Sequence, residues 1–291
     1  MRPFVSVAIP TRNRAAMLAD CLASLRAQSY AADRFEIVVV DDGSTDATVD
    51  VVLRHADGRA PQVRYVPRSH GGLNAARNAA LEASRGDPIC FVDDDVEIPP
   101  GWLTAIVDGV LQRPEAGCLG GPIRLKFEGR PPRICEMESW EWDGELDYGP
   151  DERLVEHVNG GNLAVRRWAV EAVGPFDVSL SGMGDESEWE ARLRRAGISI
   201  AYLPRAWLWH RRTAAELRPL TLLRRRFRQG VGYVGYATVV GERIAIARTL
   251  GPIPFYVAHA VRRRCFGALL EIAKKLGLTW GVLHRRRRRA A

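Results

Sequence analysis

Residues 35–46 read FEIVVVDDGSTD, a continuous apolar run that ends in two aspartates and a turn. An Ile/Val run without alternation is typical of a strand that is covered on both faces of a sheet. A second such run, ICFV at 89–92, leads directly into three aspartates at 93–95. The sequence predicts a doubly wound α/β sheet, with strands at 4–9, 35–40, 63–66 and 89–92 and helices at 15–26, 46–55 and 74–84.

The following part of the chain extends this sheet before its composition changes. We expect further elements in this order: a helix at 99–112, a strand at 118–127, an acidic and aromatic loop at 129–156, a helix at 185–196 and a strand at 198–203. In open α/β sheets, ligands bind beyond the carboxyl ends of the strands. The polar residues that follow each strand are therefore the first candidates for a site.

The formal net charge of +7 hides a strong asymmetry along the chain. Residues 1–210 carry 23 Lys and Arg against 32 Asp and Glu, a net charge of −9. Residues 211–291 carry 19 against 3, a net charge of +16. From about residue 216 the chain becomes a series of basic, apolar helical stretches. We therefore expect two domains, an α/β domain at 1–215 and a basic helical extension at 216–291.

Cysteine usage and hydropathy indicate a cytoplasmic protein. The five cysteines show no metal-ligand spacing, and we expect them to be buried thiols in a reducing compartment. The N-terminal residues lack the apolar core of a signal peptide. The uncharged runs at 229–241 and 249–261 have 13 residues each. A spanning helix needs about 20 apolar residues, so we expect neither run to cross a membrane.

The aspartates Asp93, Asp94 and Asp95 are the strongest chemical signal. Three adjacent carboxylates repel one another, and their place at the end of an apolar strand adds a desolvation cost. A divalent cation would supply the missing positive charge, and hard cations prefer oxygen ligands. Because alternate residues of an extended stretch point the same way, Asp93 and Asp95 form the expected pair. The alternative is a solvated acidic turn that also includes Glu97.

Two other segments have two interpretations each. Asp42 is placed to accept hydrogen bonds from a base or a ribose, or, like Ser44, to cap the following helix. The stretch 70–78 reads HGGLNAARN, whose glycines allow close backbone approach and whose helix start offers N–H groups to an anion. Arg77 in this stretch is also compatible with a solvated surface position.

Two candidate catalytic groups occur later in the chain. Asp185 and Glu188 have the spacing of a capping box before a helix, which leaves Glu186 available as a general base. His210 follows an apolar aromatic run. It is either a packed, hydrogen-bonded histidine or a metal ligand near the end of the sheet.

Together these features closely resemble the family 2 glycosyltransferases, which have the GT-A fold. The resemblance runs from Val5 to about His210 and rests on the order and spacing of six stretches. These are 6–14, 39–46, 74–78, 91–95, 159–162 with Arg166, and 184–193. The resemblance implies a GT-A-type doubly wound mixed sheet flanked by helices, followed by the basic helical extension.

The resemblance also implies roles for individual residues. The nucleotide-sugar would contact Pro10, Thr11, Arg12, Asp42, Arg77, Asp93 and Asp94. Asp42 would read the base, and Arg77 would assist the phosphates. A divalent cation, Mn²⁺ or Mg²⁺, would be held by Asp93, Asp95 and His210. The acceptor side would comprise Asn159, Gly160, Gly161 and Asn162. The family's catalytic acid pair falls on Asp185-Glu186 in reversed order, so either of these two residues is the expected base.

The expected function is that of a metal-dependent hexosyl- or similar transferase. It would move a sugar with inversion from a nucleotide diphosphate-sugar to an acceptor hydroxyl, in the synthesis of a cell-envelope glycan or polysaccharide. One alternative is a nucleotidyltransferase of similar sheet architecture, although PTRN at 10–13 lacks the glycines of a phosphate loop. Another is a non-catalytic protein that binds a sugar nucleotide or a membrane surface. A Rossmann dehydrogenase is disfavoured because no G-x-G-x-x-G follows the first strand.

The basic extension predicts contact with an anionic membrane surface. Arginine clusters at 224–226, 262–264 and 285–289 lie among apolar and aromatic residues, a composition that suits anionic lipid. No nucleic-acid partner is expected, because no binding module is recognisable. The remaining alternative is a solvated tail whose apolar residues pack on the body. We expect a peripheral protein on the inner face of the plasma membrane, within reach of a glycan or lipid-linked acceptor.

Overall fold

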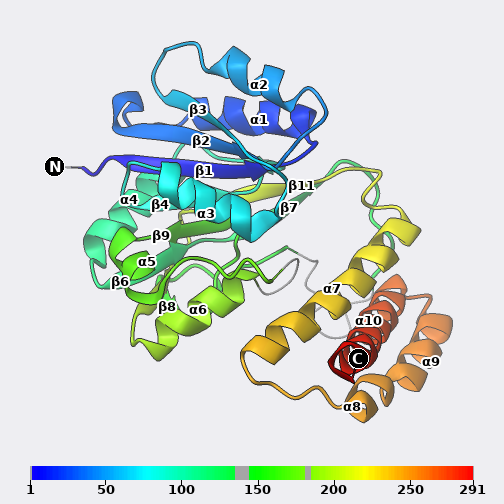
Figure 1. Cartoon of the computed structure of the whole chain (residues 1–291). Coiled ribbons are helices and arrows are strands. Elements are labelled where there is room, and N and C mark those ends of the chain that lie inside the picture. Colours follow the sequence, from blue (N-terminus) through cyan, green and yellow to red (C-terminus); the bar gives the residue numbers. More distant parts are fainter. Residues whose placement is uncertain (1, 135–143, 181–184, 291) are drawn as a thin grey trace. The chain divides into compact units, whose positions relative to one another are not determined.

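The computed structural model describes residues 2–134, 144–180 and 185–290, and the side chains of these residues except those of 185 and 285–290 (Figure 1). The chain divides into two compact units. The first, which we call the α/β body, comprises residues 1–126, 143–178 and 189–211. The second, the helical unit, comprises residues 127–142, 179–188 and 212–291.

An eight-stranded mixed sheet runs through the α/β body in the order β3-β2-β1-β4-β9-β6-β10-β8. The four strands from β3 to β4 are parallel neighbours, whereas β9 lies antiparallel between β4 and β6. The strands are β1 (Val5–Thr11), β2 (Phe35–Asp41), β3 (Gln62–Pro67), β4 (Ile89–Val92), β6 (Ala116–Gly120), β8 (Arg153–Val155), β9 (Asn162–Val165) and β10 (Ser199–Tyr202).

Helices cover both faces of this sheet, because alternate residues of the central strands point to opposite sides. Val7 and Ile9 pack into a core with α1, α2 and α4, whereas Ala8 packs into a second core with α3, α5 and α6. Neither face of the central strands reaches water, which explains their continuous apolar sequence. The helices of the body are α1 (Ala15–Arg26), α2 (Thr48–His55), α3 (Leu73–Ala83), α4 (Trp102–Gln112), α5 (Arg167–Val173) and the part of α6 (Asp185–Arg195) from residue 189 on, with a 3₁₀ turn at Ala32–Arg34.

A second, three-stranded sheet has the order β5-β11-β7, with β5 (Val96–Glu97), β11 (Leu208–Arg212) and β7 (Ile123–Phe127). The prediction of a single strand at 118–127 is therefore wrong, because the chain leaves β6 at Gly120 and enters the small sheet at Ile123. A Cβ atom on Gly121 would lie 2.1 Å from the carbonyl oxygen of Ala206. Glycine allows this close approach, and Pro122 cannot donate a ladder hydrogen bond.

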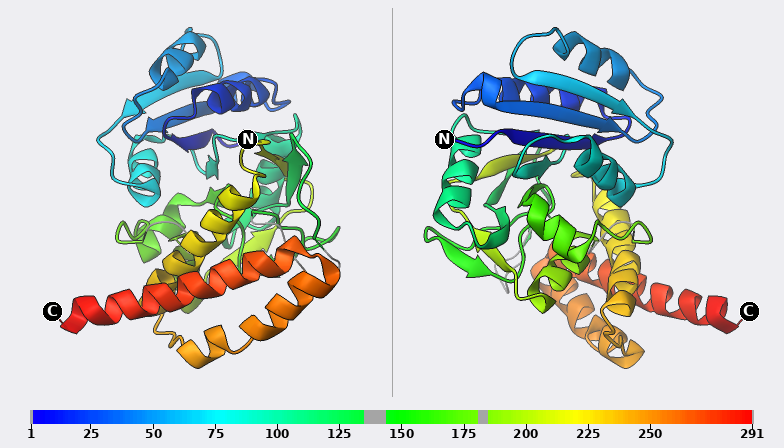
Figure 2. Two further views of the ribbon diagram at one scale, coloured as in Figure 1. Left: turned by 90° about the vertical axis from the view of Figure 1, so that its right-hand side faces the viewer. Right: turned by 60° about the vertical axis from the view of Figure 1, so that its left-hand side comes forward.

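The helical unit contains α7 (Pro219–Val239), α8 (Ile246–Leu250), α9 (Ile253–Arg263) and α10 (Phe266–Ala290). α7 and α10 contact each other and cross in both views of Figure 2. A Cβ on Gly277 would lie 2.0 Å from the carbonyl oxygen of Phe227, and one on Gly230 would lie 2.1 Å from that of Lys274. Glycines thus bring the two backbones into contact. Among the described residues, no helix combines the length and apolar character that crossing a membrane requires.

Candidate functional site

The carboxyl ends of three parallel strands bring polar residues to one edge of the α/β body. Thr11 ends β1, Asp42 follows β2, and Asp94 lies in the turn after β4. The Asp42 N–H donates to the carbonyl oxygen of Thr11 at 3.0 Å, and the Thr11 hydroxyl donates to Asp94 Oδ2 at 2.7 Å. The structure therefore brings together residues that are far apart in the sequence and that the resemblance assigned to one site.

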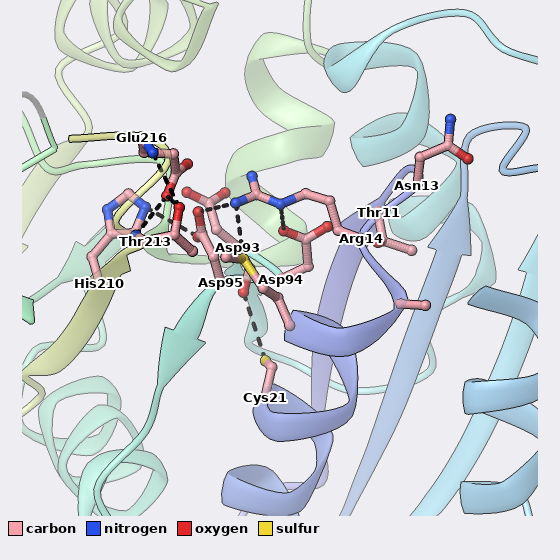
Figure 3. Close-up of polar contacts among 12 residues, drawn as sticks. Thr11, Asn13, Arg14, Cys21, Asp93, Asp94, Asp95, His210, Thr213 and Glu216 are labelled. Atoms are coloured by element: carbon pink, nitrogen blue, oxygen red, sulfur yellow. Dashed lines mark hydrogen bonds and ion pairs between the residues drawn. The ribbon is translucent and has the colours of Figure 1, made fainter. Parts of the chain in front are cut away.

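A group of possible metal ligands lies at this edge (Figure 3). Ligand atoms of Asp93, Asp95 and His210 all lie within 4.8 Å of one another. His210 reaches the aspartates because β11 pairs with β5, where it stands opposite Val96. Its Nε2 lies 3.0 Å from Asp95 Oδ1, and both side chains are buried. The two carboxylates suit Mn²⁺ or Mg²⁺, and the imidazole favours a transition metal such as Mn²⁺ over Mg²⁺.

The electrostatics of the aspartates favour a cation. Desolvation raises the pKa of Asp93, and the neighbouring Asp95 carboxylate raises it further. Desolvation also raises the pKa of Asp94 to about 7, against the opposing effect of Arg14. Asp94 and Asp95 are buried, so the alternative of a solvated acidic turn is wrong for them. A bound cation would reduce the cost of three adjacent carboxylates with little access to water.

Arg14 has a place in this site that was not predicted from the sequence. It stands at the start of α1, where Nη2 lies 2.8 Å from Asp95 Oδ2 and Nε lies 3.3 Å from Asp94 Oδ1. Its position three residues after β1, inside the stretch that resembles the family, was the available signal. Thr11 and Arg14 together fix Asp94, so this aspartate anchors the turn that carries the other two.

Asp42 organises the loop before α3. It accepts hydrogen bonds from the N–H groups of Gly71 at 3.0 Å and Gly72 at 2.9 Å, and it contacts His70 Nδ1 at 2.6 Å and the Arg68 guanidinium. Burial alone would raise the pKa of Asp42, but these partners together lower it. The structure thus places residues 68–72 around the carboxylate that was predicted to read the base. That role stays a prediction.

Neither Asp42 nor Ser44 binds the start of the helix that follows, and a different aspartate does. Asp46 Oδ1 accepts the N–H of Thr48, the first residue of α2, at 3.1 Å. Ser44 instead uses its hydroxyl oxygen to accept the N–H of Asn13 at 2.9 Å. The alternative in which Asp42 or Ser44 caps the helix is therefore wrong. Asp42 and the loop at 68–72 remain next to Arg12, whose Nη1 lies 3.2 Å from His70 Nε2.

Arg77 is buried on α3 and is not the solvated surface residue of the alternative interpretation. Its guanidinium donates to Asn74 Oδ1 at 3.2 Å and lies 5.5 Å from the centre of the Phe176 ring. Its positive charge opposes the rise in the pKa of Asp93 that desolvation causes. A buried cation near the aspartates is consistent with the predicted assistance to phosphate.

The turn at 159–162 packs directly on the aspartates. A Cβ on Gly161 would lie 2.6 Å from Asp93 Oδ2, so glycine allows this contact. Asn159 Oδ1 accepts the N–H of Gly161 at 2.9 Å and stabilises the turn. The Asn162 side chain is fully buried, accepts from Trp102 Nε1 at 2.9 Å and donates to the Ala206 carbonyl oxygen at 2.8 Å. Asn162 therefore supports the predicted acceptor side from within the core.

Asp185 and Glu186 open α6. Glu186 is half-buried, while the Asp185 side chain lies outside the described residues, as does its predicted capping contact. Which of the two acts as the base stays a prediction. Glu190, one turn further along α6, was not predicted from the sequence, and its Oε1 accepts the Val158 N–H at 2.8 Å. Glu190 thus ties α6 to the chain just before the turn at 159–162.

The family model described as "Glycosyl transferase family 2" matches residues 6–173, more than half of the chain. The chain belongs to glycosyl transferase family 2. This family 2 enzyme is 29% identical over 273 residues to the glycosyltransferase AglE of Haloferax volcanii, and the match covers 90% of the chain and 86% of that protein. It is 27% identical over 219 residues to the succinoglycan biosynthesis protein ExoM of Rhizobium meliloti, with 73% of the chain and 69% of that protein covered.

Solved structures give the fold of this family 2 enzyme. The mannosyltransferase PcManGT of Pyrobaculum calidifontis, determined in complex with GDP-Man and Mn²⁺, matches with a TM-score of 0.62 and 20% identity. The match covers 100% of the chain and 81% of that protein. At this identity the likeness shows the fold alone, and it confirms the predicted GT-A architecture.

Proposed function

We propose that this family 2 glycosyltransferase binds a nucleotide diphosphate-sugar through Mn²⁺ or Mg²⁺ held by Asp93, Asp95 and His210. It transfers the sugar with inversion to an acceptor hydroxyl. The observation that carries the proposal is the convergence of these three ligands at the carboxyl edge of the sheet. The PcManGT complex with GDP-Man and Mn²⁺, a protein of the same fold, supports it.

Residues around the aspartates suit the parts of such a donor. A divalent cation at Asp93 and Asp95 would neutralise charge that develops on the leaving diphosphate. The buried guanidinium of Arg77 adds positive charge on the same side. Asp42 holds the loop at 68–72 together beside Arg12, where we place the nucleoside.

Transfer also requires a base and an acceptor position. We assign the base to Asp185 or Glu186 and the acceptor to the side of the turn at 159–162. The carboxylate takes the proton of the acceptor hydroxyl, whose oxygen forms a bond to the anomeric carbon as the bond to the diphosphate breaks. A single displacement of this kind inverts the anomeric configuration. We propose a glycan or lipid-linked acceptor of the cell envelope, and the similarity to a succinoglycan biosynthesis protein supports this choice.

A thermal-shift panel of nucleotide diphosphates and nucleotide sugars, each with and without Mn²⁺, tests the donor and the metal together. A donor at about 100 times its Kd stabilises the folded state by about 2.7 kcal/mol, which corresponds to roughly 5–10 °C in Tm. We expect this shift in the wild type only with Mn²⁺. We expect Asp95→Asn to lose it.

Glu97→Gln is the matched control, since Glu97 is an exposed carboxylate two residues away that pairs with Lys126. It should keep the Mn²⁺-dependent shift. Equal shifts with and without Mn²⁺ in all three proteins would refute the metal assignment. Incubation of the stabilising donor with Mn²⁺ tests whether the protein is catalytic. Slow release of free sugar argues against a non-catalytic protein. In a separate incubation with a nucleoside triphosphate and a sugar 1-phosphate, formation of the nucleotide diphosphate-sugar with release of pyrophosphate would indicate a nucleotidyltransferase.

A further inference from the structure

Helix α9 turns its apolar side outward. None of its residues is buried, and Phe255 and Val261 keep 54% and 74% of their surface exposed. Val257 is exposed too and lies one turn from Val261 on the same side of the helix. The other side of α9 faces α10, where Lys275 Nζ lies 5.5 Å from the centre of the Tyr256 ring. A surface helix of a globular protein normally has the opposite arrangement.

Helix α10 carries a second exposed apolar stripe. Leu269, Leu276, Trp280 and Leu283 are all exposed, and their spacings of seven, four and three residues place them on one face. The packing face of α10 lies elsewhere, because Gly277 contacts the backbone of α7. The apolar side chains of these two stripes are therefore exposed on the helical unit.

In the sequence, arginines lie next to the exposed apolar residues of α9 and to those of α10. Arg262, Arg263 and Arg264 are exposed and directly follow the stripe of α9, and the sequence places 285–289, five arginines, directly after the stripe of α10. Residues 211–291 carry a net charge of +16. Like charge of this size disfavours pairing with the same helical unit of a second copy of the chain. Apolar stripes flanked by arginines match a bilayer interface whose headgroups are anionic.

We propose that α9 and α10 form a lipid-binding surface that lies on an anionic bilayer. Their exposed apolar side chains enter the boundary between headgroups and acyl chains, and Arg262, Arg263 and Arg264 pair with lipid phosphates. Only the purpose of this surface rests on the proposed function. It would hold the transferase close to a lipid-linked acceptor.

Flotation of the full-length protein with vesicles tests the surface without any sugar nucleotide or metal. We expect the wild type to float with vesicles that contain phosphatidylglycerol, and to bind pure phosphatidylcholine vesicles at least about tenfold more weakly. Binding should decline as salt is added, because screening weakens the arginine contacts. Equal binding to both vesicles, or binding to neither, would overturn the proposal.

Paired substitutions locate the surface. Phe255→Ser with Val261→Ser should weaken partitioning by at least about tenfold, since the apolar contribution of α9 is lost. Arg262→Gln with Arg263→Gln should weaken it by about fivefold for each arginine. The matched control is Leu53→Ser with Val178→Ser on the α/β body, where the side chains are 57% and 61% exposed.

The control pair should float like the wild type. All variants change exposed residues and should keep the wild-type Tm, so a loss of flotation reports on binding. Undiminished flotation of the Phe255/Val261 variant would overturn the proposal. Binding of single-stranded DNA by the wild type and this variant alike, without flotation, would also overturn it in favour of a nucleic-acid partner. Normal Mn²⁺-dependent donor binding without flotation would refute the lipid surface and leave the proposed transferase intact.

Discussion

Replacing Arg14 with glutamine should destabilise the metal-free protein and strengthen its response to Mn²⁺. Arg14 is the guanidinium that contacts Asp94 and Asp95 at 3.3 and 2.8 Å. Its side chain is 35% exposed, whereas those of the two aspartates are 7% and 4% exposed. Without Arg14, two buried carboxylates lose the positive charge that contacts them both.

The size of the effect follows from this burial. Breaking a fully buried ion pair costs about 3–5 kcal/mol, and an exposed pair contributes about 0–1 kcal/mol. Because water reaches Arg14, we expect Arg14→Gln to cost about 1–3 kcal/mol. For a protein of this size that corresponds to a decrease in Tm of roughly 3–9 °C. Arg59→Gln is the control, since Arg59 is 84% exposed and should leave Tm unchanged.

The response of Tm to Mn²⁺ shows whether Arg14 competes with a metal for Asp95 or whether Arg14→Gln only loses packing contacts. Asp95 Oδ2 accepts from Arg14, so a cation at Asp95 competes with the guanidinium for this carboxylate. In Arg14→Gln the competitor is gone, and the rise in Tm on adding Mn²⁺ should exceed that of the wild type by several degrees. Scanning calorimetry with and without Mn²⁺ measures both quantities. A wild-type Tm together with an unchanged or smaller Mn²⁺ shift would refute the reasoning.

Three further predictions concern the base, the helical unit and the Asp42 loop. Glu186→Gln should bind donor normally and lose transfer, and full transfer with an inactive Asp185→Asn would move the base to Asp185. Gly277→Leu should destabilise the helical unit by at least about 2 kcal/mol, because even a Cβ there would lie 2.0 Å from a carbonyl oxygen of α7. Gly101→Ala, with open space at that position, should unfold like the wild type in denaturant. Asp42→Asn should lower the free energy of unfolding by about 1–3 kcal/mol at pH 7. The pKa of Asp42 is lowered from 3.8, so this difference should persist down to about pH 4 and shrink only as the pH falls further, as urea unfolding across pH would show.

The sequence predicted the parallel half of the sheet well, because those strands are buried on both faces and their apolar runs are unbroken. It did not predict that 116–127 serves two sheets. Strand periodicity carries no information about which sheet a strand joins. The division of 116–127 between two sheets depends on Gly121. This glycine lies against Ala206, which is 85 residues further along the chain.

The candidate site also contains residues that the sequence predicted and residues that it did not. The close approach of Asp93 and Asp95 was predictable, because alternate residues after a strand point the same way, and their role as metal ligands stays a prediction. Arg14 and Glu190 were not predictable, because a single charged residue on a helix usually lies in water. Their importance comes from partners 81 and 32 residues away, Asp95 for Arg14 and the Val158 N–H for Glu190. Only the folded chain brings Arg14 to Asp95 and Glu190 to Val158.

The middle aspartate shows why a run of three is stable although only its outer members are placed to bind a cation. Asp94 lies in the turn after β4 and points toward the end of β1 and the start of α1. There the Thr11 hydroxyl and Arg14 receive it. Arg14 then reaches past Asp94 to Asp95, so one guanidinium compensates an anchoring carboxylate and a ligand carboxylate together. A cation that takes over Asp95 removes one of the contacts of Arg14 and leaves Asp94 fixed. In the proposed metal complex the turn would therefore exchange its internal cation for the metal without losing its anchor.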